Sequence, residues 1–227
     1  IRVYLFDELR PTPELSFAIR ETGSIAGINV TASHNPKEYN GYKVYWEDGA
    51  QLPPDHAAQI SGRLAEIDLF RDVKTCTLEE AVEKNLVTVL SREMDEKYLE
   101  NVLAQSVGRE AVEACAAGFK VVYTSFHGAG YRLVPEALRR LGLREILTVP
   151  QQMELDGAFP TVKNPNPEEK EGFRLAIALA KEAGCDLIIG TDPDADRVGI
   201  VVRDTAGEYR TMSGNQVGVL LLDYICK

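Results

Sequence analysis

Cysteine and long apolar runs are both scarce in this chain of 227 residues, and their scarcity excludes several classes of protein. The four cysteines are scattered and form no Cys-x-x-Cys pair: Cys76, Cys115, Cys185 and Cys226. This spacing argues against a disulfide framework or a zinc site, and the apolar surroundings of Cys115 and Cys185 predict two small core residues. Because no apolar run approaches a membrane span and no signal peptide is visible, we expect a cytoplasmic protein with no membrane partner.

Positive charge is also in short supply. The chain has 25 Lys and Arg residues against 35 Asp and Glu residues, which gives a net charge of −10. A nucleic-acid surface is usually basic, so this balance argues against a nucleic-acid partner. An acidic protein that binds phosphate must gather its cations locally, and His34, Lys43 and Arg197 are candidates for such a patch.

Three aspartates stand at alternate positions just after a short apolar run. The run 187–189 predicts a buried strand, and Asp192, Asp194 and Asp196 follow it, with Arg197 directly after them. Alternate spacing in an extended loop can aim three carboxylates at one point, where their mutual repulsion favours a bound divalent cation. An all-carboxylate set suits Mg²⁺ better than Zn²⁺, and Mg²⁺ commonly shares its ligand shell with a phosphate oxygen.

Three other interpretations apply to this acidic segment. An EF-hand loop begins with the same alternation, but it needs Gly at its sixth and Glu at its twelfth position, where this chain has Arg197 and Arg203. A solvated acidic turn without a metal is the plainest alternative. An aspartate after a strand, here Asp192, can also serve as the nucleophile of a phosphatase, although that interpretation leaves Ser33 without a role.

A hydroxyl group follows another predicted strand. Residues 26–30 predict the strand, and Ser33-His34-Asn35-Pro36 form the turn beyond it. A serine in a turn is usually only a local hydrogen-bonding residue. The neighbouring His34 does not indicate a catalytic triad, because adjacent side chains in an extended loop tend to point apart. A hydroxyl that can carry phosphate and a tri-aspartate cation site are, however, the two halves of a phosphoryl-transfer centre.

Taken together, these segments resemble those of the α-D-phosphohexomutase superfamily, the phosphoglucomutases, phosphomannomutases and their relatives. Further segments match the family in the same order along the chain: Asn40-Gly41-Tyr42-Lys43, then 123–128, 156–160 and 164–168. The segment 37–46 is most similar to the bacterial phosphoglucomutase branch near the phosphopentomutases. The resemblance covers nearly the whole chain.

The resemblance implies a reaction and a set of roles. The reaction is intramolecular phosphoryl transfer on a sugar phosphate, of the glucose 1-phosphate to glucose 6-phosphate type, through a bisphosphorylated sugar and with a sugar 1,6-bisphosphate as activator. Ser33 is the implied phosphoserine, Lys43 the general base and Arg197 the cation that stabilises the transferring group. Neighbouring cations are expected to lower the pKa of Lys43. The remaining implied site residues are His34 as a further catalytic residue near the phosphoserine; Thr31, Asn35, His127 and Arg197 for substrate or phosphate; and Ser33, Asp192, Asp194 and Asp196 for Mg²⁺.

Simpler roles stay open for some of these residues. Lys43 stands in a strand-like alternation that also fits a solvent-facing lysine. Arg197 can pair with the aspartates and orient them, and His34 and His127 can be structural. A non-catalytic or phosphatase-like metal-binding module on the same fold is the alternative function for the chain.

The order of predicted elements indicates an α/β fold with doubly wound, mostly parallel sheets, in two consecutive α/β domains of a four-domain parent. We assign residues 1–92 to the C-terminal part of a phosphoserine domain, 93–212 to a metal-binding domain and 213–227 to a helix that leads into a third domain. The predicted strands are 1–6, 26–31, 41–46, 86–90, 119–125, 145–149 and 186–189, with a hairpin of 198–202 and 208–211. The predicted helices are 13–22, 54–67, 78–84, 95–107, 134–141, 167–183 and 214–226.

We expect the chain to be a piece of a longer protein at both ends. The chain begins on a strand without an initiator Met and ends on an apolar helix with nothing to pack against. The resemblance implies that domains three and four of the parent chain, which recognise the sugar and its non-reacting phosphate, are partners of this chain. We therefore expect the isolated chain to have little or no mutase activity.

Overall fold

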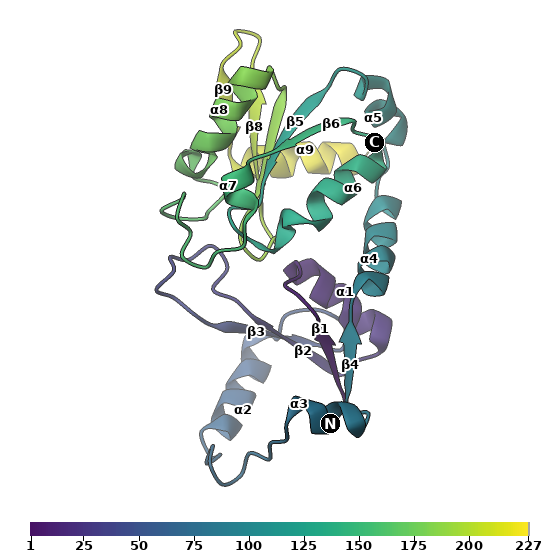
Figure 1. The fold of residues 1–227 in the computed structure, drawn as a ribbon, viewed down its shortest axis with the longest axis vertical. Coiled ribbons are helices and arrows are strands. Elements are labelled where there is room, and N and C mark those ends of the chain that lie inside the picture. The colour runs from purple at the N-terminus through teal and green to yellow at the C-terminus, as the bar shows by residue number, and fades with distance from the viewer. Residues whose placement is uncertain (227) are drawn as a thin grey trace.

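The computed structural model describes residues 1–226 and consists of two lobes, the N-terminal one below and the C-terminal one above in Figure 1. In the N-terminal lobe, β1 pairs in parallel with β4, and β2 pairs antiparallel with β3. Its elements are β1 (Val3–Phe6), α1 (Thr12–Thr22), β2 (Ala26–Val30), β3 (Tyr42–Trp46), α2 (Pro54–Leu64), α3 (Leu78–Glu83) and β4 (Val87–Leu90). Lys227, the last residue of the predicted segment 213–227, lies outside the described residues.

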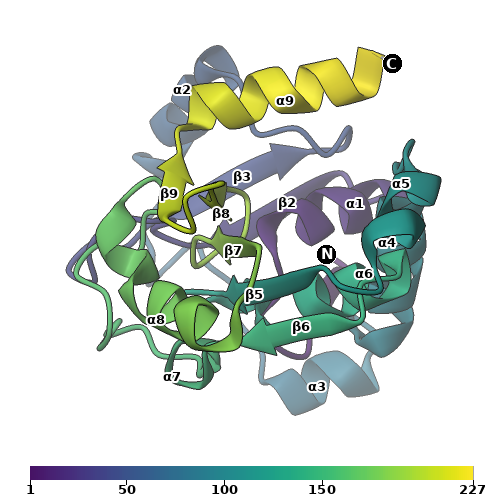
Figure 2. The ribbon, with the colours of Figure 1, turned by 90° about the horizontal axis from the view of Figure 1, so that it is seen from above.

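The C-terminal lobe is built on a five-stranded sheet with the strand order β6-β5-β7-β8-β9. Strands β6, β5 and β7 are parallel, and β8 and β9 extend the sheet antiparallel. Helix α8 packs on β5 and β7, and α6 packs on β6 from the other face (Figure 2). The helices are α4 (Arg92–Ala104), α5 (Arg109–Cys115), α6 (Leu133–Leu141), α7 (Pro150–Met153), α8 (Arg174–Ala183) and α9 (Gly214–Cys226). The strands are β5 (Lys120–Thr124), β6 (Glu145–Thr148), β7 (Leu187–Thr191), β8 (Val198–Arg203) and β9 (Tyr209–Met212).

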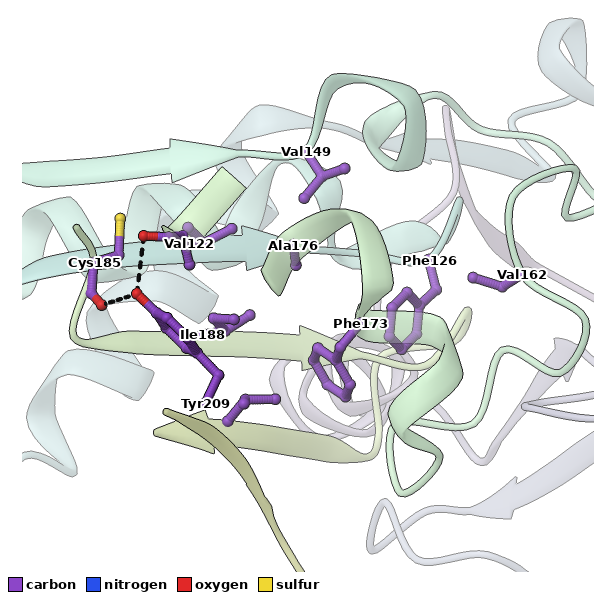
Figure 3. Close-up of a cluster of buried hydrophobic side chains, with 11 residues drawn as sticks. Val122, Phe126, Val149, Val162, Phe173, Ala176, Cys185, Ile188 and Tyr209 are labelled. Atoms are coloured by element: carbon purple, nitrogen blue, oxygen red, sulfur yellow. Dashed lines mark hydrogen bonds between the residues drawn. The ribbon is translucent and has the colours of Figure 1, made fainter. Parts of the chain in front are cut away.

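The apolar core of this lobe lies between α8 and the sheet (Figure 3). The rings of Phe126 and Phe173 meet edge to face with their centroids 5.1 Å apart, and both side chains are fully buried. The Tyr209 hydroxyl lies 2.9 Å from the carbonyl oxygen of Ala180 and 2.6 Å from that of Cys185, so its one polar atom is satisfied inside the core. This core packs against β5 and β7, and the acidic loop begins where β7 ends.

The structure confirms the predicted α/β class and corrects several details. The helix predicted for 167–183 is shorter, because residues 166–169 form a turn and a 3-10 helix (Lys170–Phe173) precedes α8. Helices α5 and α7 were not predicted, since both are too short to show a periodic pattern. Cys115 is exposed on α5, contrary to the prediction of a core residue, whereas Cys185 is buried as predicted. The proposed domain boundaries stay a prediction.

Helix α9 exposes most of its apolar side chains. It does have a contact in the chain, contrary to the expectation of none, because the Tyr224 hydroxyl accepts hydrogen bonds from the backbone N–H groups of Val107 and Gly108. Val217 is its one buried residue, and Val219, Leu220, Leu221, Leu222 and Ile225 are exposed. Within residues 1–226, no helix combines the length and the hydrophobicity needed to cross a membrane.

A buried ion cluster joins the two lobes. Arg10, which precedes α1, donates from Nε to Asp95 Oδ1 on α4 at 2.6 Å. Arg132, just before α6, donates from Nη2 to Asp95 Oδ2 at 2.7 Å. The side chains of Arg10 and Asp95 are only 3% and 5% exposed. A buried pair of this kind is costly to break on one side, so the cluster fixes how α1 sits against α4 and α6.

Glu14 lies beside this cluster and is fully buried. Neither of its carboxyl oxygens has a hydrogen-bond partner among the described residues. Burial, with the nearby Asp95 carboxylate adding to it, raises the pKa of Glu14 to about 8. Between an ordinary pKa of 4.5 and this raised value, the folded state keeps a proton that the unfolded chain releases, so stability falls as the pH rises through this window.

We therefore expect Glu14→Gln to remove part of the pH dependence of stability. The free energy of unfolding of the variant, relative to the wild type, should increase steadily between about pH 5 and about pH 8. Urea denaturation at several pH values measures this difference, with Glu182→Gln on the exposed side of α8 as the control. A difference between Glu14→Gln and wild type that does not change with pH would contradict the assignment.

Candidate active site

The Ser33 loop connects β2 to β3 and reaches from the N-terminal lobe toward the C-terminal lobe (Figure 1). Ser33 has a φ of +53°, in the left-handed region that a serine seldom adopts. The Thr31 side chain stabilises this turn, because its Oγ1 accepts a hydrogen bond from the Ser33 backbone N–H at 2.8 Å. The backbone N–H of Thr31 donates to Gly41 O at 3.0 Å and closes the base of the loop. Such local strain is often found at functional sites.

The acidic loop connects β7 to β8 in the C-terminal lobe. Asp192 is fully buried, Asp194 is nearly so, and Asp196 is exposed. One carboxylate oxygen from each residue lies within 4.8 Å of the others. The backbone N–H of Arg197 donates to Asp192 Oδ1 at 2.9 Å, which fixes the end of the loop.

The loop after β5 supports the acidic loop from behind. The backbone N–H of Ala129 donates to Pro193 O at 2.7 Å. A Cβ atom on Gly128 would overlap the backbone of Pro193, so only glycine allows this close approach. Deeper in the lobe, the Tyr123 hydroxyl and Thr191 Oγ1 are 2.8 Å apart.

The two loops meet although they are far apart in the sequence. Ser33 Oγ donates to Asp192 Oδ2 at 3.0 Å. Lys43 Nζ, from β3, donates to Asp194 Oδ2 at 2.8 Å and to Asp196 Oδ2 at 2.7 Å. The structure thus brings the hydroxyl, the three carboxylates and the lysine into one site between the lobes.

The aspartates have strongly unequal proton affinities. Burial, followed by the neighbouring Asp194 carboxylate, raises the pKa of Asp192 to about 7. Burial acts on Asp194 in the same direction, but the Lys43 ammonium, followed by hydrogen bonding with Asp192 and with Thr12, outweighs it and lowers the pKa of Asp194. Asp194 Oδ1 is buried and has no hydrogen-bond partner among residues 1–226. Three convergent carboxylates, one with an unpaired buried oxygen, fit a hard divalent cation such as Mg²⁺.

Lys43 differs from the expectation drawn from the sequence. Its neighbours are carboxylates rather than cations, so although burial lowers its pKa, the hydrogen bonds to Asp194 and Asp196 raise that pKa above the ordinary value. The ammonium group bridges Asp194 and Asp196 and balances part of their negative charge. Lys43 is therefore not simply a solvent-facing strand lysine.

The two histidines lie in different settings. His34 Nδ1 is 3.3 Å from Ser33 Oγ, so the two adjacent side chains converge instead of pointing apart as expected. The left-handed backbone at Ser33 explains this, because the loop is not extended there. His127 is buried, with Nδ1 2.9 Å from Glu154 O and Nε2 2.9 Å from Thr161 Oγ1. A carbonyl oxygen only accepts, so Nδ1 carries a proton and His127 anchors the segment 154–161.

Arg197 and Asn35 lie at the solvent-exposed edge of the site. The Arg197 guanidinium is exposed, and among residues 1–226 the structure gives it no hydrogen bond or ion pair. Asn35 is also exposed. A cleft of about 380 Å³ opens beside Ser33, lined among others by Arg10, Asn29, Ser33, Lys37, His127 and Asp156. Its size is suitable for a small phosphorylated ligand.

Comparison with known proteins decides the family. Residues 1–71 match the description "Phosphoglucomutase/phosphomannomutase, alpha/beta/alpha domain I", and residues 96–207 match domain II of the same family. The chain belongs to the phosphoglucomutase/phosphomannomutase family. A phosphoglucomutase of Staphylococcus epidermidis is 43% identical over 231 residues, which cover 100% of this chain and 40% of the relative. A phosphoglucomutase of Staphylococcus haemolyticus is 41% identical over 225 residues, covering 99% of this chain and 40% of the relative.

A solved structure from the same family has a similar fold. The crystal structure of a "putative phosphomannomutase" from Thermus thermophilus matches with a TM-score of 0.72 and 27% identity, covering 92% of this chain and 43% of that one. The chain thus spans about 40% of the length of the phosphoglucomutases that it matches.

Sequence reasoning missed several residues that build this family member's site. Thr12 and Asn29 both contribute to a hydrogen-bonded chain that ends on Asp194. Gln152 is fully buried and bonds to Thr124, Thr161 and the backbone of Gly172, which supports the loop around His127. The one feature of the sequence that marks Thr12 is its place between two prolines. This pattern predicts the start of a helix and does not indicate a role in the site.

Proposed function

We propose that the full-length protein containing this chain is a phosphohexomutase that moves a phosphoryl group between two hydroxyls of one sugar through Ser33. One observation carries the proposal: Ser33 Oγ lies 3.0 Å from Asp192 Oδ2, a carboxylate oxygen of the cation site, although 159 residues separate them. A hydroxyl hydrogen-bonded to such a site is suited to carry a phosphoryl group whose oxygens share the cation. Membership of the phosphoglucomutase/phosphomannomutase family supports the same reaction.

The residues present divide the chemistry between them. Asp192, Asp194 and Asp196 would hold Mg²⁺, together with an oxygen on Ser33. When bound, Mg²⁺ neutralises charge that develops on the transferring phosphoryl group. The exposed Arg197 guanidinium, without a protein partner among residues 1–226, is available to the equatorial phosphoryl oxygens. Thr31 holds the Ser33 turn, while His34, Asn35 and His127 complete the polar surroundings.

Lys43 is the proposed base. In the first half-reaction a sugar hydroxyl attacks the phosphorus and its proton passes to the neutral amine of Lys43. The bond between phosphorus and Ser33 Oγ breaks, and Ser33 Oγ keeps the electron pair and departs as the alkoxide that attacks in the second half-reaction. In the second half-reaction Ser33 Oγ attacks the other phosphate of the sugar bisphosphate, and Lys43 returns the proton to the departing sugar oxygen. Once the charges of Asp194 and Asp196 are neutralised, the interactions that raise the Lys43 pKa are lost, while burial, which lowers it, remains and favours the neutral amine that a base requires.

A mutase assay tests this proposal. Full-length protein is supplied with glucose 1-phosphate, Mg²⁺ and a trace of glucose 1,6-bisphosphate, and both glucose 6-phosphate and inorganic phosphate are measured. Mannose, glucosamine and pentose phosphates are assayed in parallel to find the preferred sugar. We expect isomerisation with little release of phosphate. Release of phosphate without isomerisation would favour the phosphatase-like alternative, and no reaction with any of the sugars would contradict the proposal.

A further inference from the structure

Thr12, the first residue of α1, makes two contacts with the acidic loop of the other lobe. Its backbone N–H donates to Asp194 O at 2.8 Å, and its Oγ1 donates to Asp194 Oδ2 at 3.1 Å. Thr12 is only 4% exposed. It stands between Pro11 and Pro13, whose rings restrict the backbone on both sides. The threonine is thus a fixed support for one particular carboxylate.

Asn29 orients the Thr12 hydroxyl. Its Nδ2 donates to Thr12 Oγ1 at 2.5 Å. Because the threonine hydroxyl has a single proton, accepting from Asn29 leaves that proton for Asp194. Asn29 lies on β2 directly opposite Lys43 on β3, and Lys43 Nζ donates to the same Oδ2 atom at 2.8 Å. Two cross-strand neighbours therefore converge on one carboxylate oxygen, Lys43 directly and Asn29 through Thr12.

The two carboxylate oxygens of Asp194 differ in their hydrogen bonding. Oδ2 accepts hydrogen bonds from Thr12 and Lys43. Oδ1 is buried and has no hydrogen-bond partner within residues 1–226. A buried carboxylate oxygen without a partner is costly unless a cation binds it. The arrangement leaves Oδ1 as the oxygen for a metal ion.

We propose that Thr12, oriented by Asn29, is a positioning residue that holds Asp194 with Oδ1 presented to the divalent cation. The inference rests on the cation site of the proposed function and adds to it the residues that fix its geometry. Partners that orient a metal ligand typically change metal affinity by about 10- to 100-fold when they are lost. Thr12 also links α1 of the N-terminal lobe to the metal ligand, so the lobe that carries Ser33 takes part in forming the cation site.

The test measures Mn²⁺ binding to the full-length protein by isothermal titration and by electron paramagnetic resonance, without substrate. Thr12→Val removes the hydroxyl but keeps the shape, and Thr12→Ser restores the hydroxyl. Thr22→Val, at the other end of α1, is the matched control. Among residues 1–226 the Thr22 hydroxyl bonds only within the N-terminal lobe, to Ala18 O, Ile19 O and Ser24 Oγ. We expect Thr12→Val to weaken Mn²⁺ binding about 10-fold or more, while Thr12→Ser and Thr22→Val bind nearly as the wild type.

Thermal unfolding without metal separates positioning from stability. If Thr12 serves only to start α1, Thr12→Val will lower the melting temperature while leaving Mn²⁺ affinity unchanged, and that result overturns the inference. If Thr12→Val does not fold, Asn29→Ala is measured in its place. We expect this variant to lose Mn²⁺ affinity severalfold, and an unchanged affinity would overturn the inference. A wild-type protein that binds no Mn²⁺ would instead contradict the cation site of the proposed function itself.

Discussion

Ser33→Ala is expected to reduce mutase activity by at least about 10³-fold. The physical reason is that the variant has no side-chain oxygen at this position to carry the phosphoryl group. Among residues 1–226 the Ser33 hydroxyl makes hydrogen bonds only with Asp192 and His34, so the fold should be preserved. The measurement is the steady-state rate of glucose 6-phosphate formation at saturating glucose 1,6-bisphosphate.

Two controls make this result specific. Ser61→Ala, on the exposed surface of α2, should leave the rate unchanged. The Ser33→Ala protein should still bind Mn²⁺, because the three aspartates remain in place. An undiminished rate in Ser33→Ala would show that Ser33 is only a loop residue and would refute the proposed function.

Asp192→Asn is expected to have opposite effects on function and on stability. Mn²⁺ affinity and mutase activity should each fall by about 100-fold or more, because a charged ligand of the cation is lost. The metal-free protein should be at least as stable as the wild type, since Asp192 is fully buried beside the Asp194 carboxylate and loses its charge. The asparagine oxygen can still accept the hydrogen bond from the Arg197 backbone. Titration with Mn²⁺ and thermal unfolding without metal measure the two effects.

A surface aspartate is the matched control for this change. Asp55→Asn, in the exposed first turn of α2, should alter neither Mn²⁺ binding nor activity. If Asp192→Asn lowers the melting temperature of the metal-free protein by several degrees and binds Mn²⁺ normally, Asp192 is a structural residue and the assignment of the cation site is wrong.

The sequence was sufficient to predict the parts of the site that have a local pattern. The spacing of Asp192, Asp194 and Asp196 after a predicted strand can be recognised in the sequence alone. In the structure these three carboxylates do converge. Ser33 follows a strand as well, and ligands collect where strands end in α/β folds. The structure places Ser33 and Asp192 in contact, as expected for two halves of one site.

What could not be predicted depends on contacts between distant segments. The partners of Lys43 lie about 150 residues further along the chain, so its electrostatic surroundings were not visible in the sequence. The same holds for Thr12, whose hydroxyl bonds to Asp194, and for His127, whose ring anchors the segment 154–161. The exposure of Cys115 was missed because the short helix α5, which has no buried residue, gives no periodic signal.

The most direct test of the central claim is to locate the phosphoryl group on the protein. Full-length protein is incubated with glucose 1,6-bisphosphate and Mg²⁺, digested, and analysed by mass spectrometry, with and without hydroxylamine treatment. Phosphoryl transfer through Ser33 predicts one phosphoryl group on the peptide containing residues 31–37, stable to hydroxylamine. A protein that carries no phosphate, or one that carries it on Asp192 as a hydroxylamine-sensitive acyl phosphate, would contradict the account.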